Sequence, residues 1–286
     1  MRTAVMTDTN SGMMECDAEQ YGVHMVPMPI IIDEKTYYEG RDIDSDGFFE
    51  ALYSDKTVST SQPSPVDVME AWERVLKMGY DEILYIPMSS GLSESCATAV
   101  ALSEEYEGKV YVVDNHRISV TQWASALYAK SLVKAGKTAA QIKEILEKAA
   151  YDASIYITVD TLYFLKKGGR ITPAVAAIGT ALKIKPVLSI QGDKLDSFAM
   201  ARSMKKGISV MIDTIRKDID NRFGGDENAV VATAGSGLTS EEKESYLEDV
   251  RKAFPGHQVE YYPLPLSTCV HLGRGAFGVG AYPKFE

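Results

Sequence analysis

Two clusters of hydroxyl side chains stand directly before predicted helices, where they are well placed for binding chemistry. The first cluster contains Ser59, Thr60, Ser61 and Ser64, and a helix is predicted to follow from about Pro65 to Met78. Ser64 is an ordinary helix cap. The other hydroxyls, close to free backbone amides at a helix start, are suited to binding an anion. A polar loop without any ligand explains them equally well.

The second cluster is the string SSGLS, Ser89 to Ser93, which follows a strand predicted over Glu82 to Pro87. A Ser/Gly turn between a strand and a helix offers hydroxyls and free amides to an anion. In a parallel sheet this turn lies at the carboxyl end of the strand, where open α/β folds place their ligands. The alternative is that Ser89 and Ser90 only cap a helix. Ser93 lacks a GxSxG context and an assignable Asp and His pair, which argues against a nucleophile.

The third candidate is His271, which begins a glycine-rich string near the end of the chain. Gly273, Gly275 and Gly278 match GxGxxG formally, but too few residues follow to build a βαβ unit, so a dinucleotide site is not expected. Such glycines predict a tightly folded segment whose backbone can closely approach another part of the protein or a ligand. A histidine alone is more often a surface or core residue, and this setting favours a functional role.

The sequence contains no pattern typical of several other kinds of site. No zinc, EF-hand or ATP-binding loop pattern occurs, so neither a metal nor a cofactor is expected. The formal charge of -10, from 30 basic and 40 acidic residues, disfavours nucleic acid. Three scattered cysteines without a CxxC pair fit a reducing cytoplasm. No apolar run approaches the roughly 18 residues of a membrane span. We therefore expect a cytoplasmic protein without a transmembrane segment.

Short β-branched runs alternate with longer helical patterns, which predicts an α/β fold with mainly parallel sheets. The length of 286 residues suggests about two domains, and we place them at residues 1–153 and 154–286. In the first, strands are predicted over Thr3 to Met6, His24 to Ile32, Glu82 to Pro87 and Lys109 to Val113, with further helices over Ser119 to Lys134 and Ala139 to Ala150.

The second predicted domain opens with a strand over Ile155 to Val159 and a short helix that ends at the string Lys166 to Arg170. Two glycines in that string interrupt the helix. The other predicted elements are a helix over Pro173 to Lys183, a hairpin of Pro186 to Ile190 and Lys194 to Phe198, a helix near Lys205 to Ile219, a strand at Val230 to Thr233, a helix at Ser240 to Ala253 and a strand at Gln258 to Tyr262.

Six short strings together resemble the DegV family: Asp8 after the first strand, TSQPS at Thr60 to Ser64, SSGLS at Ser89 to Ser93, KKGGRI at Lys166 to Ile171, IKPVL at Ile184 to Leu188 and HLGRGA at His271 to Ala276. They occur in the expected order across nearly the whole chain. The resemblance implies two α/β domains that hold a long-chain fatty acid, with its carboxylate near the face between them.

The resemblance also implies a role as the binding subunit of a bacterial fatty acid kinase. A separate, ATP-using catalytic subunit would then make the acyl phosphate, and transient contact with a membrane surface would accompany lipid exchange. Carried onto this sequence, the carboxylate-binding positions are Ser61 with Thr60 and Ser93 with Ser90. Arg170 and His271 fall near the carboxylate mouth and the kinase contact, with Arg170 expected to face the partner.

This chain departs from the family pattern at Glu94 and Arg274 and over Asp114 to Gln122. Glu94 competes with a ligand anion for the positive end of the same helix. Two alternatives therefore stay open beside the fatty-acid-binding hypothesis. One is a small serine hydrolase of acyl esters that uses Ser93. The other is a binding module for a different anionic metabolite, which would need a short, wet pocket instead of a long apolar one.

Overall fold

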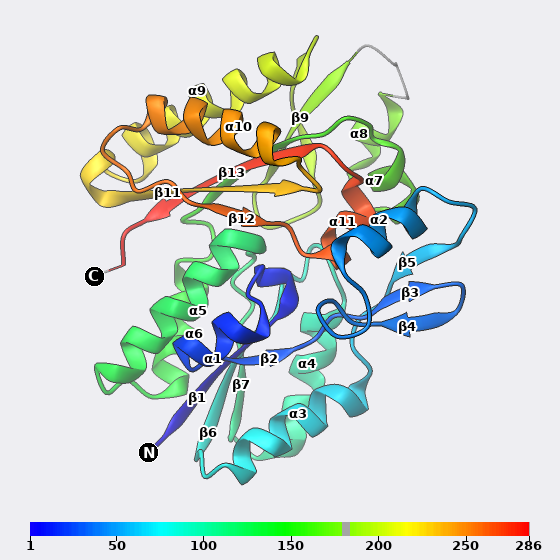
Figure 1. The fold of residues 1–286 in the computed structure, drawn as a ribbon. Coiled ribbons are helices and arrows are strands. Elements are labelled where there is room, and N and C mark those ends of the chain that lie inside the picture. Colours follow the sequence, from blue (N-terminus) through cyan, green and yellow to red (C-terminus); the bar gives the residue numbers. More distant parts are fainter. Residues whose placement is uncertain (179–183, 286) are drawn as a thin grey trace.

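A four-stranded parallel sheet forms in the first part of the chain (Figure 1). The computed structural model describes residues 1–178 and 184–285. In spatial order the strands are β2 (His24–Val26), β1 (Thr3–Asp8), β6 (Glu82–Ile86) and β7 (Val110–Val112). Every residue of β1 and β6 is buried, as expected for parallel strands with helices on both faces. The predicted α/β character of this part is confirmed.

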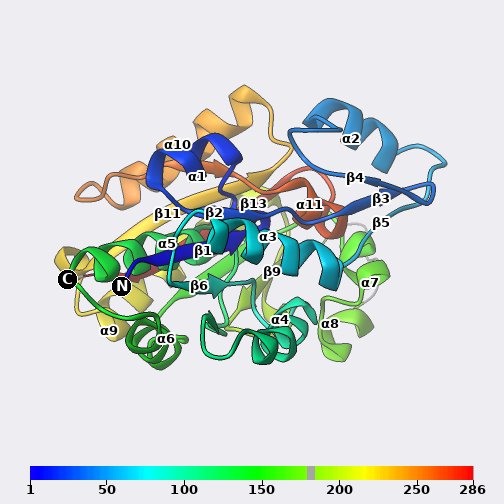
Figure 2. The same cartoon turned by 90° about the horizontal axis from the view of Figure 1, so that it is seen from below.

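Helices cover both faces of this sheet (Figure 2). On one face lie α3 (Pro65–Lys77) and α4 (Ser95–Ser103), and on the other lie α1 (Glu15–Tyr21), α5 (Ser119–Lys134) and α6 (Ala139–Lys148). Ser64 caps α3 as predicted, because its hydroxyl accepts the Asp67 backbone N–H at 3.1 Å.

A three-stranded antiparallel sheet lies at the end of the molecule away from both termini (Figures 1 and 2). Its strands are β4 (Lys35–Tyr37), β3 (Ile30–Ile32) and β5 (Val58–Thr60), and α2 (Ser45–Leu52) accompanies it. The prediction of one strand over His24 to Ile32 is wrong. Pro27 and Pro29 divide it, since proline has no N–H for a strand ladder, and β2 and β3 join different sheets.

A six-stranded mixed sheet forms in the second part of the chain. In spatial order it contains β10 (Asp196–Ala201), β9 (Lys185–Ile190), β8 (Ser154–Thr158), β13 (Ala276–Pro283), β11 (Ala229–Ser236) and β12 (Tyr261–Pro263). Only the β11–β12 pair is parallel. The predicted β9–β10 hairpin is confirmed, but the expectation of mainly parallel sheets is wrong here.

The helices of the second part lie in two groups. One group, α9 (Met204–Arg222) and α10 (Ser240–Ala253), packs on the face of the six-stranded sheet that points away from the first sheet (Figure 1). The other group, α7 (Tyr163–Gly168), α8 (Pro173–Ala177) and α11 (Leu266–Leu272), lies toward the three-stranded sheet. Part of the helix predicted over Pro173 to Lys183 falls on residues 179–183, outside the described residues. None of the helices in the described ranges is both long and apolar enough to cross a membrane.

One apolar core joins the two parts of the chain. Helix α5 contacts β11 and β13 as well as β1, so it lies between the two larger sheets. A continuous cluster of buried side chains runs from β3 and α2 through Met88 and Leu92 to β8 and α11. This cluster surrounds the candidate site.

Candidate functional site

A cavity, here called the inner cavity, opens between the first sheet, the six-stranded sheet and α11. It encloses about 930 Å³, including the part open to solvent. Most of its wall is apolar: Met28, Met88, Leu92, Ile118, Val120, Ile155, Ile157, Leu165, Ile190, Leu195, Ala234, Leu264, Leu272 and Val279. The polar wall residues are Asn10, Thr60, Ser61, Ser93, Ser119, Arg170, Ser267, Thr268 and His271.

His271 is held in this wall by contacts on both sides of its ring. Its Nε2 lies 2.9 Å from Thr60 Oγ1, at the end of β5. On the other side, a Cβ atom at Gly168 would lie only 2.1 Å from His271 Nδ1, so only glycine allows this approach. Burial, together with the Arg170 cation, lowers the pKa of His271 to about 4. The imidazole is therefore neutral at pH 7.

Ser61 and Ser93 both line the inner cavity. The Ser61 side chain is exposed and its hydroxyl donates to the Gln62 carbonyl at 2.8 Å. The Ser93 hydroxyl accepts the Ser95 backbone N–H at 3.2 Å, near the start of α4. Both oxygens keep further hydrogen-bonding capacity for a ligand.

Ser90 does not line the cavity, in contrast to Ser93 three residues later. Its backbone N–H points to Asp114 Oδ1 at 3.4 Å. The neighbouring Ser89 is fully buried and its hydroxyl donates to the carbonyl of Gly192 in the β9–β10 turn. The loop therefore presents Ser93 to the cavity and uses Ser89 to join the hairpin.

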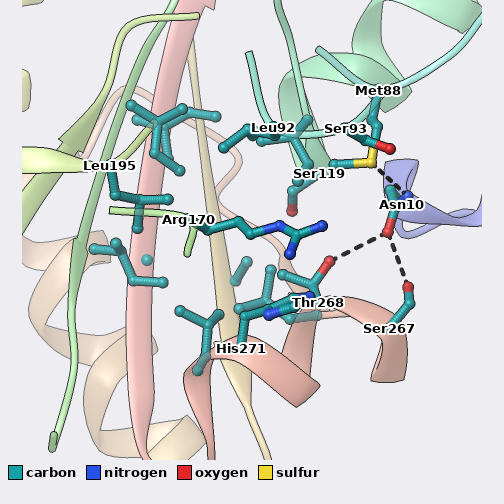
Figure 3. A pocket seen from close by; sticks show the side chains of 18 of the residues that line it. Asn10, Met88, Leu92, Ser93, Ser119, Arg170, Leu195, Ser267, Thr268 and His271 are labelled. Atoms are coloured by element: carbon teal, nitrogen blue, oxygen red, sulfur yellow. Dashed lines mark hydrogen bonds between the residues drawn. The ribbon is translucent and has the colours of Figure 1, made fainter. Parts of the chain in front are cut away.

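Arg170 follows α7 and lies in the cavity wall, partly buried. Its guanidinium donates to the carbonyl of Gly168. Figure 3 shows the side chain extending into the cavity together with Thr268 and His271. The sequence predicted a cation that faces a partner protein, and that role stays a prediction.

The sequence analysis missed four polar wall residues: Asn10, Ser119, Ser267 and Thr268. The Asn10 amide oxygen accepts the Ser267 hydroxyl at 2.8 Å, and its Nδ2 lies 2.8 Å from Met88 Sδ (Figure 3). Two signals were present in the sequence. Asn10 follows β1, whose carboxyl end adjoins that of β6, and helical spacing places Ser267 and Thr268 on the same face as His271.

Asp8 supports the wall from behind and is fully buried. Its carboxylate accepts the backbone N–H groups of Met88 at 2.8 Å and Asn10 at 2.9 Å, and Gln122 Nε2 at 3.1 Å. Burial raises the pKa of Asp8 to about 6, although these hydrogen bonds act in the opposite direction. Because Met88 and Asn10 both line the cavity, Asp8 fixes two segments of its wall.

Glu39 supports α11 in a similar way. Its Oε2 accepts the backbone N–H of Leu266, the first residue of α11, at 2.8 Å. Burial raises the pKa of this carboxyl group, and the hydrogen bond lowers it. Glu39 thereby ties the helix that holds His271 to the region of the three-stranded sheet.

The geometry favours binding over hydrolysis. Among the residues that the structure describes, no hydrogen-bond partner orients His271 Nδ1, whereas a catalytic triad needs a third group there. No group of His, Cys, Asp or Glu in the described ranges is arranged to hold a metal ion. A mostly apolar wall with a few polar side chains and one guanidinium is suited to an amphipathic molecule with one anionic end.

Comparison with known proteins agrees with the sequence resemblance. A family model described as uncharacterised protein, DegV family, matches residues 2–284. The chain belongs to the DegV family. A DegV domain-containing protein of Deinococcus radiodurans is 31% identical over 284 residues, which cover 99% of each chain. Protein DegV of Bacillus subtilis is 30% identical over 284 residues, which cover 98% of each chain.

Solved DegV structures share the whole fold. A DegV family protein from Thermus thermophilus, described by its fatty acid binding, superposes on this chain with a TM-score of 0.87 at 26% sequence identity. The match covers 99% of this chain and 100% of the Thermus thermophilus chain. DegV of Bacillus subtilis, described as a fatty acid binding protein, gives a TM-score of 0.85 at 28% identity with the same coverage. The mixed α/β arrangement is therefore that of the DegV family.

Proposed function

We propose that this protein binds a long-chain fatty acid in the inner cavity, with the carboxylate at the end lined by Thr60, Ser61, Ser93 and His271. The observation that carries this proposal is the lining of the cavity, which is mostly apolar and includes these four polar side chains, with Thr60 and His271 in contact. The fatty acid binding described for the Thermus thermophilus and Bacillus subtilis proteins supports it.

In this proposal, burial of the acyl tail provides most of the affinity for the fatty acid, and the hydroxyl groups orient its carboxylate. Each buried methylene contributes about 0.8 kcal/mol, so a chain of about sixteen carbons has a large gross driving force before ordering costs. A carboxylate needs a few donors when it leaves water, and neutral His271 can donate through one ring nitrogen. Ser90 lies outside the wall, so we do not assign it to the carboxylate site.

We further propose that the protein presents the carboxylate to a separate kinase and is not itself an enzyme. A carboxylate oxygen would attack the γ-phosphorus of ATP held by that partner, the bond to the β-phosphate oxygen would break, and acyl phosphate and ADP would form. Arg170 is suited to this step, because a guanidinium stabilises developing phosphoryl charge. Residues 1–153 and 154–286 would act as two domains of a cytoplasmic protein that contacts membranes transiently to exchange lipid.

Chain-length dependence of binding tests the fatty-acid proposal. Delipidated protein should bind saturated acids of 10 to 16 carbons with an affinity that rises about fourfold per methylene before ordering costs, as long as the cavity has room. A small sugar phosphate should not compete. Equal affinity for short and long acids, or displacement of palmitate by the sugar phosphate, would favour the short polar site of another anionic metabolite.

A further inference from the structure

Two glycines of the central strand β13 face the inner cavity. Successive residues of a strand point to opposite faces of the sheet. Phe277 and Ala281 pack with α9 and α10 on one face, so Gly278 and Gly280 lie on the other, and both line the cavity. Gly278 is also the last glycine of the GxGxxG string, which forms no dinucleotide site, so the string leaves its role open.

The two glycines have different surroundings. A Cβ atom at Gly280 would lie 3.0 Å from Val120 Cγ2, so α5 packs directly against this position. The atoms nearest to a Cβ atom at Gly278 would belong to the neighbouring strands of the same sheet, at 3.7 Å and beyond. These are ordinary contact distances. Packing within the protein therefore favours glycine at position 280 but leaves room for a side chain at position 278.

The backbone of Gly278 does not require glycine either. Its φ lies outside the left-handed region, so an L side chain is compatible with its conformation. The strand pairs with β8 on one side and β11 on the other, and the Gly278 carbonyl accepts the Tyr246 hydroxyl at 2.8 Å from the opposite face. Gly278 thus belongs to a firmly held part of the cavity wall, and neither backbone conformation nor protein packing explains a glycine there.

The six-stranded sheet forms an entirely apolar floor of the inner cavity. Among the residues described, the sheet contributes to the wall only Ile155, Ile157, Ile190, Ala234, Gly278, Val279 and Gly280. The polar wall residues come instead from the first part of the chain, from α11 and from Arg170. In Figure 3, Leu195, which precedes β10, lies on the opposite side of Arg170 from Asn10. A hydrocarbon tail fits this floor, whereas a carboxylate would lose its hydrogen bonds there.

We propose that Gly278 is a specificity-determining residue, whose missing side chain leaves the space that the acyl tail fills and so sets how long a chain the protein accepts. Directly across from it lie Ile157 on β8 and Ala234 on β11, so the floor is lower at Gly278 than at the isoleucine beside it. The inference rests on the proposed function, because it needs a fatty acid in the inner cavity. It assigns this glycine to the ligand and not to the fold.

Chain-length profiles test this assignment. Delipidated wild type, Gly278→Ala and Gly278→Val are titrated with saturated acids of about 8 to 18 carbons. Acids long enough to reach Gly278 should bind about tenfold more weakly to Gly278→Ala, the size expected when a methyl group enters a filled space, and Gly278→Val should lose more. Acids too short to reach it should keep wild-type affinity within about twofold. The length at which the loss begins measures how far Gly278 lies from the carboxylate.

Two further variants separate the cavity from the packing of the sheet. Val231→Ile is the matched control, because it adds one carbon atom, as Gly278→Ala does, to the core on the opposite face of the sheet, and Val231 does not line the cavity. Its profile should match the wild type. Ile157→Val makes the opposite change by removing a carbon atom beside Gly278, and it should shift the profile toward longer acids. Thermal unfolding followed by circular dichroism checks that each variant is folded.

Three results would overturn the inference while leaving fatty acid binding intact. They are a folded Gly278→Ala variant with the wild-type profile, an equal loss for acids of every length, and a change in Val231→Ile as large as that in Gly278→Ala. If neither Gly278 variant folds, an unshifted profile in Ile157→Val overturns it. Absence of fatty acid binding in the unmodified protein is a different outcome, because it would contradict the proposed function itself.

Discussion

Thr60 Oγ1 and His271 Nε2 lie 2.9 Å apart, although 211 positions separate the two residues in the chain. Thr60 ends β5 of the three-stranded sheet, and His271 belongs to α11 near the end of the chain. This contact brings the first hydroxyl cluster and the histidine of the glycine-rich string to one place. Neither segment forms the polar end of the cavity alone, so the site depends on the whole fold.

Removal of the Ser93 hydroxyl should weaken fatty acid binding by about 1 to 3 kcal/mol if no other donor compensates. Ser61→Ala should have the same kind of effect, and the double variant should show whether the two act together. Ser90→Ala is the matched control, because Ser90 lies in the same loop but outside the cavity wall. Affinity is measured by titration of delipidated protein. Unchanged affinity in the Ser61 and Ser93 variants, with folding intact, would remove both residues from the site.

Arg170→Ala should retain bound fatty acid but support much slower acyl phosphate formation with a cognate kinase and ATP. The physical reason is that the guanidinium lies in the cavity wall with His271, at the proposed carboxylate site, where phosphoryl charge would develop. His271→Ala should also slow the reaction. Bound lipid and single-turnover rates are measured on the same samples. A variant that loses lipid and reacts normally once reloaded would show that the residue serves binding alone.

The pKa of His271 should rise when a fatty acid is bound. Burial and Arg170 hold this pKa at about 4, and a nearby carboxylate favours the imidazolium form. The titration can be followed by NMR of the imidazole Cε1–H in delipidated and loaded protein. Arg170→Gln should also raise the pKa in the delipidated protein. A pKa that stays the same or falls on loading would place the carboxylate away from His271.

Asp8 should make the unfolding free energy depend on pH. Its pKa rises from 3.8 to about 6 on folding, so the folded protein binds the extra proton between these values. This contribution to stability is therefore present at low pH and falls by ~2 kcal/mol as pH rises from 4 to 6. Urea unfolding of Asp8→Asn should lack this part of the pH dependence.

Glu82→Gln provides the control for Asp8. Glu82 is also a buried carboxylate of the first sheet, but it lies at the opposite end of the strands and accepts the Thr3 hydroxyl at 2.6 Å and the Ala139 N–H at 2.8 Å. This variant should keep the fall in stability between pH 4 and 6. An identical pH profile for wild type and Asp8→Asn would refute the assignment to Asp8.

Local patterns in the sequence predicted most elements of the first sheet and its helices. Continuous apolar runs such as β1 and β6 and the capped, amphipathic α3 are determined by nearby residues. The central strand β13 was not predictable in this way. Gly278 and Gly280 lower its strand propensity. Gly280 has a long-range reason, because a Cβ atom there would lie only 3.0 Å from Val120 of α5.

The candidate site was predictable in part for the same reason. Hydroxyl groups after a strand or before a helix, as at Ser61 and Ser93, follow from local geometry. The contact between Thr60 and His271 depends on the position of β5 of the three-stranded sheet beside α11. Such contacts join residues that are far apart in the chain, so no local pattern reports them.

The most direct test of the central claim is mass spectrometry of organic extracts from the purified protein, with lipid quantified against protein concentration. The account predicts a long-chain fatty acid at close to one molecule per chain, and slow exchange with added C14 to C18 acids. Extracts without stoichiometric fatty acid, together with no binding of these acids by the delipidated protein, would contradict it.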